Sequence, residues 1–210
     1  MAALNLRTTV LPRFPARRIA NWLTAAGIAA LLVVLGLAGP GTVSVLRYHR
    51  SAVLSGQAWR LVTGHLVHAD AAHLAWNLAG LALVWWLFAA EFTLGGWCLV
   101  MLASTAAIDL GFLLFDPDIE WYVGFSGVLH GCMAAGLLAW LHRGRDWLVM
   151  VVAAVFAAKL GWEHFAGPVP FTGGTLSVPV VVEAHTYGAV GGALAALWLL
   201  RRGPGRSAPL

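Results

Sequence analysis

Six long apolar stretches, separated by charged residues, proline or glycine, leave this 210-residue chain few ways to fold. A helix of about 20 apolar residues crosses the hydrocarbon core of a bilayer, and most of the stretches approach that length. Only 10% of the residues are charged, whereas a soluble domain has about 25%. We therefore predict an all-α, polytopic membrane protein with six transmembrane helices. Their approximate bounds are 19–39, 72–90, 96–115, 126–141, 147–160 and 181–200.

The basic side chains gather on one predicted side of the membrane. Of the 13 lysines and arginines, nine precede the first apolar segment, lie between the fourth and fifth, or follow the sixth. By the positive-inside rule both termini are then cytoplasmic. This distribution also accounts for the net charge of +4, so we infer no nucleic-acid partner. The predicted organisation is a cytoplasmic basic tail (1–18), one membrane domain (19–202) and a second cytoplasmic tail (203–210).

A serine lies between glycines at the start of the fourth apolar segment, in the sequence Gly124-Phe-Ser126-Gly127-Val-Leu-His-Gly. A hydroxyl flanked by residues without side chains can be approached closely by another backbone, and Gly-x-Ser-x-Gly turns present a nucleophilic serine in many hydrolases. The spacing here is Gly-x-Ser-Gly, which also suits close packing of membrane helices. The motif by itself leaves both interpretations open.

Helix geometry places Ser126 and His185 at nearly the same depth. From Ser126 to Arg143, near the cytoplasmic end of the fourth segment, is 17 residues, or about 25 Å at 1.5 Å per residue. From His185 to Arg201 on the sixth segment is 16 residues, or about 24 Å. Both side chains are therefore predicted to lie several ångströms below the outer surface of the membrane.

Two polar residues of the second segment bracket the same level. His73 and Asn77 lie 18 and 14 residues from Glu91 at the cytoplasmic end, or about 27 Å and 21 Å away. They are four residues apart, hence on one helix face, and neither is easily tolerated facing lipid. If the helices are neighbours, His73 and Asn77 join Ser126 and His185 in one buried layer.

The glycines that follow His185 would allow the required approach of two helices. Gly188 and Gly192 are spaced as in the small-xxx-small pattern of closely packed membrane helices. A general base must come within about 2.6–3.2 Å of its nucleophile, which requires close approach when the two lie on different helices.

Two further groups of polar residues have structural interpretations that we prefer. His65 and His68, three residues apart, suit either a metal site or an interfacial loop (40–71) that they support, and we favour the second role. Asp109 is interpreted as a hydrogen-bonded structural acid. We therefore expect no metal.

The polar residues near the end of the fifth segment are assigned to the membrane interface. Lys159 and Glu163 are four residues apart and are predicted to form a structural ion pair there. The loop that follows (164–180) is rich in glycine and proline and is a candidate mobile gate over the buried layer.

Together these motifs resemble the rhomboid family of intramembrane serine proteases. The resemblance implies a six-helix rhomboid-like bundle without a cofactor, in which Ser126 is the nucleophile and His185 the general base. His73 and Asn77, with the backbone N–H of Ser126, would form the oxyanion hole. No carboxylate is assigned as a third catalytic residue, because Glu183 lies two residues before His185 and hence on another helix face. A Ser–His dyad is therefore expected. The matching motifs are Trp59-Arg60, His73-x3-Asn77, Gly124-x-Ser126-Gly127 and Ala184-His185-x2-Gly188-x3-Gly192.

His130-Gly131 and Lys159-x2-Trp162-Glu163 narrow the resemblance to the rhombosortase branch. Members of that branch are associated with bacterial surface proteins that end in a Gly-Gly motif, an apolar helix and a basic tail. The resemblance implies such membrane-anchored proteins as substrates, and a place in the bacterial inner membrane with the site open to the periplasmic side. His130 lies one turn below the serine, and three roles stay open: packing partner of His185, which we prefer, polar structural residue, or second base.

Two other functions fit part of the pattern. A histidine-rich haem or redox membrane protein would use paired imidazoles at matching depth, but it leaves the glycine-flanked serine unexplained. An inactive rhomboid-like binding protein would keep the fold without the chemistry, although both residues of the expected dyad are present.

Overall fold

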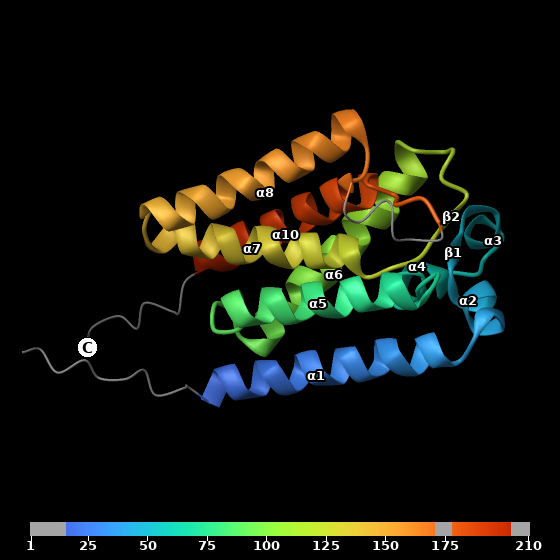
Figure 1. The fold of residues 1–210 in the computed structure, drawn as a ribbon, viewed down its shortest axis with the longest axis horizontal. Coiled ribbons are helices and arrows are strands. Elements are labelled where there is room, and N and C mark those ends of the chain that lie inside the picture. The colour runs from blue at the N-terminus through green and yellow to red at the C-terminus, as the bar shows by residue number, and fades with distance from the viewer. Residues whose placement is uncertain (1–15, 171–177, 203–210) are drawn as a thin grey trace, which may run out of the picture.

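The computed structural model describes residues 16–170 and 178–202, and within them six long helices form a bundle (Figure 1). Each long helix coincides with one of the predicted apolar segments, so the predicted helical architecture is confirmed. The helices are α1 (Ala16–Leu37), α5 (Ala71–Phe88), α6 (Leu94–Leu114), α7 (Ser126–Arg143), α8 (Trp147–Ala166) and α10 (Glu183–Arg202).

Four of these helices, namely α1, α5, α6 and α8, are long and apolar enough to cross a membrane. The chain is thus a multi-pass membrane protein, and the count of six crossings stays a prediction. Helices α7 and α10 have a similar length but are less apolar, with polar side chains in their first turns and arginines in their last turns. They are also well buried, with ten of the 18 residues of α7 shielded by protein. A helix that faces protein instead of lipid does not need to be apolar all round.

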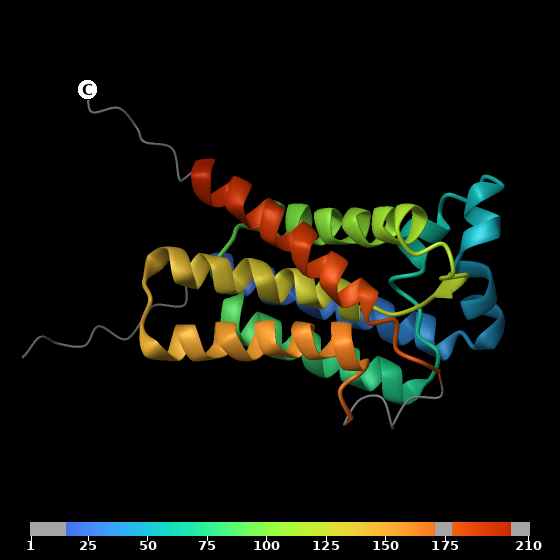
Figure 2. The same cartoon turned by 90° about the horizontal axis from the view of Figure 1, so that it is seen from above.

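Helix α10 lies at the centre of the packing, crossing between α6 and α7 (Figure 2) and making its largest contacts with them. Helix α1 packs against α5 at one edge of the bundle. Helix α8 runs beside α7, touches the rest of the bundle lightly, and leaves most of its surface exposed. The bundle therefore has a tight centre and a loosely attached outer helix.

Helices α7 and α10 meet backbone to backbone at glycines. A Cβ atom on Gly188 would fall on the carbonyl oxygen of Gly127, and one on Gly192 would fall on the carbonyl oxygen of Gly131. The predicted small-xxx-small contact is confirmed, and α7 is its partner. Any side chain at these positions would push the two helices apart.

A cap of short elements covers one end of the bundle (Figure 1). The segment 40–71, predicted as an outer loop that lies in the interface, contains short helices and a strand, and arginine side chains that donate to backbone carbonyls hold it together. Arg60 Nη1 bonds to the carbonyl of Arg47 at 2.8 Å, and Arg50 bonds to carbonyls at the end of α6. The cap comprises α2 (Pro40–Leu46), β1 (Tyr48–His49), α3 (Arg50–Leu54), α4 (Arg60–Thr63) and β2 (Trp121–Tyr122), with β1 and β2 paired antiparallel.

At the other end of the bundle Glu91, just after α5, accepts hydrogen bonds from Trp140 and Arg143 of α7 at 3.0 and 2.7 Å. The predicted tails lie largely or wholly outside the described residues. So does the middle of the predicted gate (164–180), whose first residues belong to α8.

The glycine contact between α7 and α10 can be tested with two alanine variants. We expect Gly188→Ala to lower the free energy of unfolding by about 1–3 kcal/mol, because the new methyl group overpacks the contact with Gly127. Gly161→Ala on α8 is the matched control, since a Cβ atom there meets nothing within 4 Å. Unfolding in mixed micelles, with an increasing fraction of a denaturing detergent, measures the free energy of unfolding of both variants. Equal stability of the two variants would contradict the backbone contact.

Candidate functional site

Ser126 and His185 face each other across the glycine contact. Ser126 is the first residue of α7 and His185 lies in the first turn of α10. Ser126 Oγ is 2.9 Å from His185 Nε2, and the imidazole is buried. Helix geometry predicted equal depth for these residues, and the structure brings them within hydrogen-bonding distance. A hydroxyl in contact with an imidazole is the arrangement of an activated nucleophile.

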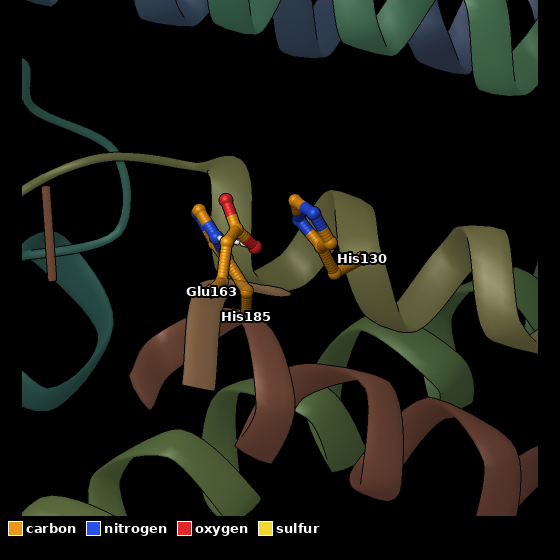
Figure 3. A group of neighbouring side chains, drawn as sticks. All are labelled: His130, Glu163 and His185. Carbon is orange, nitrogen blue, oxygen red and sulfur yellow. Dashed lines mark hydrogen bonds and ion pairs between the residues drawn. The ribbon is translucent and has the colours of Figure 1, made fainter. Parts of the chain in front are cut away.

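A carboxylate contacts the other side of the imidazole. Glu163 Oε2 on α8 is 3.0 Å from His185 Nδ1, and Glu163 is only 2% exposed (Figure 3). The sequence argument identified no third residue, because it ended the fifth segment near residue 160, whereas α8 continues to Ala166. A signal was present: Glu163 lies 16 residues from Trp147, about 24 Å along a helix, which is the depth of the other site residues.

Lys159 and His130 extend this contact. Lys159 Nζ is 2.6 Å from Glu163 Oε2 and 2.7 Å from His130 Nε2. The predicted ion pair is present, but its carboxylate is buried against the imidazole of His185 instead of lying at an open interface. The His130 ring stacks on that of His185, with centroids 4.0 Å apart and planes 13° apart.

The hydrogen-bond partners determine which nitrogen of His130 carries a proton. His130 Nδ1 lies 2.7 Å from the backbone carbonyl of Ser126, which can only accept, so Nδ1–H is the donor. The Lys159 ammonium can only donate, so His130 Nε2 accepts from it. The ring of His130 is therefore neutral.

His73 and Asn77 lie beside Ser126 on α5. Gly124 has a φ of 118°, and a Cβ atom there would lie 2.6 Å from the His73 ring, so that glycine allows the ring to pack against the loop before Ser126. Tyr122 Oη donates to the Gly124 carbonyl at 2.7 Å and holds this loop. Asn77 Nδ2 donates one hydrogen to the His73 carbonyl at 2.9 Å, and its second hydrogen is left for another acceptor.

A cavity of about 310 Å³ opens onto these groups between α5, α7 and α8. One end of the cavity is polar. It is lined by Lys159, Glu163 and the five site residues that the sequence predicted, which are His73, Asn77, Ser126, His130 and His185. The remainder is apolar. Its lining includes Trp76, Leu83, Val84, Leu129, Met133 and Phe156.

His65 and His68 are buried in the protein beside the site. His65 Nε2 contacts Asp109 Oδ1 at 3.3 Å, which accords with a structural acid, while His68 packs edge-on against His73 with centroids 5.1 Å apart. Burial and the neighbouring His73 lower the pKa of His68 to about 3, so this imidazole is uncharged at neutral pH. The two histidines are thus both buried, and they contact different residues of the protein.

Neither metal nor haem chemistry fits the histidines near Ser126. Among the described residues His130, Glu163 and His185 are close enough to share a metal ion. The Lys159 ammonium, bonded to His130 and Glu163, already supplies the cation there. Axial haem ligands point at the iron from opposite sides of the porphyrin, whereas the two imidazoles here are stacked face to face.

Comparison with known proteins agrees with this geometry. Residues 55–202 match the Rhomboid domain family. Over 121 residues the chain is 27% identical to proteins named Rhomboid protease GlpG from Klebsiella pneumoniae subsp. pneumoniae and from Klebsiella pneumoniae strain 342. The match covers 56% of this chain and 41% of each relative, so it spans less than half of their length. Since the family match extends over more than half of the chain and includes both Ser126 and His185, this chain belongs to the rhomboid family.

Proposed function

We propose that this rhomboid-family protein is an intramembrane serine protease that hydrolyses a peptide bond in or near a transmembrane anchor of its substrate. The observation that carries the proposal is the 2.9 Å contact between Ser126 Oγ and His185 Nε2, at the polar end of a cavity within apolar helices. The rhomboid relatives, which are named proteases, support it.

The reaction follows from this contact. Ser126 Oγ attacks the scissile carbonyl while its proton passes to His185 Nε2, and His185 then protonates the leaving amine. A water molecule releases the acyl group from Ser126 in a second step with the same base. The serine therefore ends the cycle unchanged, with one peptide bond hydrolysed.

Three donors are available for the oxyanion of the tetrahedral intermediate. The backbone N–H of Ser126 lies in the first turn of α7, where amides have no carbonyl partner within the helix and the helix dipole is positive. The free hydrogen of the Asn77 amide and the ring of His73 line the same cavity. Such preorganised donors act where the negative charge develops, in surroundings that exclude water.

We further propose that all six long helices cross the membrane, with both termini on the cytoplasmic side and the cap on the outer side. The arginines in the last turns of α7 and α10 support this orientation under the positive-inside rule. In the bacterial inner membrane, the cap and the site would then face the periplasm.

The shapes of the cavities support membrane-anchored proteins with a C-terminal Gly-Gly motif as substrates. The apolar part of the 310 Å³ cavity lies between α5 and α8, which scarcely touch each other, and it suits an apolar substrate helix. A second cavity beside Ser126 and His73 holds only about 20 Å³. This leaves little room for a substrate side chain, and a glycine needs none.

The assignment of nucleophile and base predicts that Ser126→Ala and His185→Ala each reduce kcat by roughly 10⁶-fold, to the detection limit. Release of a reporter with a Gly-Gly, apolar and basic C-terminal tail, co-expressed with the protein, measures this. Ser55→Ala and His164→Ala are matched controls at exposed positions. Substantial cleavage by purified Ser126→Ala protein would refute the assignment, and an inert wild type would favour a non-catalytic binding role.

The oxyanion role predicts a smaller effect on α5. Asn77→Ala and His73→Ala should each lower kcat by about 10²–10³-fold, since the other donors remain. Cleavage rates of the purified variants test this, and labelling of Ser126 by a fluorophosphonate probe reports that the nucleophile is intact. Complete loss of cleavage in both variants, with normal labelling, would contradict the division of roles.

The narrow cavity predicts a requirement for small residues at the scissile bond. Replacing Gly-Gly by Val-Val in the reporter tail should abolish its release, while Ala-Ala should be released slowly. Immunoblotting of released and membrane-bound reporter distinguishes these outcomes. Equal release of all three tails would exclude the Gly-Gly motif as the recognised feature.

A further inference from the structure

We propose that Glu163 and Lys159 form a positioning ion pair for His185, which fixes the tautomer of the base and balances the charge of the site. This inference rests on the proposed function and adds a third and a fourth residue to the expected Ser–His dyad. Both lie on α8, the outer helix that otherwise touches the bundle lightly.

The tautomer follows from the contacts of His185. The Glu163 carboxylate can only accept a hydrogen bond when ionised, so at 3.0 Å it requires a proton on His185 Nδ1. His185 Nε2 then carries a lone pair, which faces Ser126 Oγ at 2.9 Å. Without the carboxylate, the tautomer with a proton on Nε2 would become available, and that form cannot take the serine proton.

The charge balance follows from burial. Glu163 is 2% exposed, and an ionised carboxylate in such a place is costly unless it is paired and hydrogen-bonded. Lys159 supplies the opposite charge, with its Nζ 2.6 Å from Glu163 Oε2. The Lys159 side chain is 32% exposed. The pair is neutral as a unit, so the site presents a directed hydrogen-bond acceptor to His185 without a net charge.

His130 holds the far side of the pair. It accepts from Lys159 through Nε2 at 2.7 Å and donates through Nδ1 to the carbonyl of Ser126 at 2.7 Å. The hydrogen bonds therefore form a closed ring: from the Ser126 hydroxyl through His185, Glu163, Lys159 and His130 back to the Ser126 backbone. This ring assigns His130 a positioning role in addition to its stacking on His185.

The hydrogen-bond ring also suits the proton transfers of the proposed reaction. When the serine proton arrives on His185 Nε2, the imidazole becomes positive, and the Glu163 carboxylate beside Nδ1 stabilises that charge. The proton leaves again from Nε2 to the amine, so no proton needs to move onto Glu163. Glu163 and Lys159 keep their charges throughout.

Kinetics of purified variants in proteoliposomes provide the first test. Glu163→Gln should lower kcat by about 10⁴-fold with KM little changed, since an amide can donate to Nδ1 and favour the wrong tautomer. Lys159→Met should lower kcat by roughly 10–100-fold, as is usual when a partner that orients a functional group is removed. Lys159→Arg keeps the charge and should restore most of the activity. Glu183→Gln, an exposed acid on α10, is the matched control.

Nitrogen NMR of histidine-labelled protein provides a readout that a structural role of Glu163 would not change. In the wild type, His185 should carry its proton on Nδ1 and none on Nε2, and Glu163→Gln should shift the population to the other tautomer. The wild-type spectrum needs no variant, so it tests the inference even if Glu163→Gln fails to fold. A proton on Nε2 of His185 in the wild type would overturn the inference.

The outcomes separate this inference from the proposed function. If Ser126→Ala is inactive while Glu163→Gln keeps the wild-type kcat, the positioning pair is refuted and the protease stands. If the wild type cleaves no anchored substrate, the protease is refuted, and the tautomer of His185 still decides whether Glu163 positions the imidazole.

Discussion

The backbone contact between α7 and α10 is the constraint on which the rest of the structure depends. Gly127 and Gly188 touch through main-chain atoms, and Ser126 and His185 each lie within one turn of that contact. In lipid no hydrophobic force draws helices together, so they associate through close packing, which small residues permit, and through hydrogen bonds between helices. The distance between Ser126 Oγ and His185 Nε2 is therefore set by helix packing, and glycine is required because any larger residue would widen it.

The second constraint is that polar groups in an apolar medium need partners. The ring from Ser126 through Glu163 to His130 gives each of its members a partner. Between described residues, it also provides the side-chain hydrogen bonds that connect α8 to α7 and α10. Unpaired, these groups would be costly at this depth. The interactions around the His185 imidazole thus also hold the outer helix in place.

Much of this arrangement follows from the sequence, because the rise of a helix is fixed. Counting residues from the cytoplasmic ends predicted one depth for Ser126 and His185, and the spacing of the glycines predicted a close helix contact. The same count applied to Glu163 would have placed it at this depth as well. Glu163 was assigned to the interface because the apolar stretch ends near residue 160, whereas α8 continues to Ala166. The order of the cap was also missed, because it depends on arginines that reach carbonyls far away in the sequence.

Access to the site is limited by the residues that form its walls. The cavity lies between α5, which carries His73 and Asn77, and α8, which carries Lys159 and Glu163. Moving α5 outward would withdraw the proposed oxyanion donors, and moving α8 outward would break the hydrogen-bond ring around His185. A substrate that forces either wall apart would therefore displace the groups to which the proposed function assigns the cleavage. Under the proposed function, this loss disfavours a substrate that is bulky at the scissile bond, which agrees with the proposed preference for glycine.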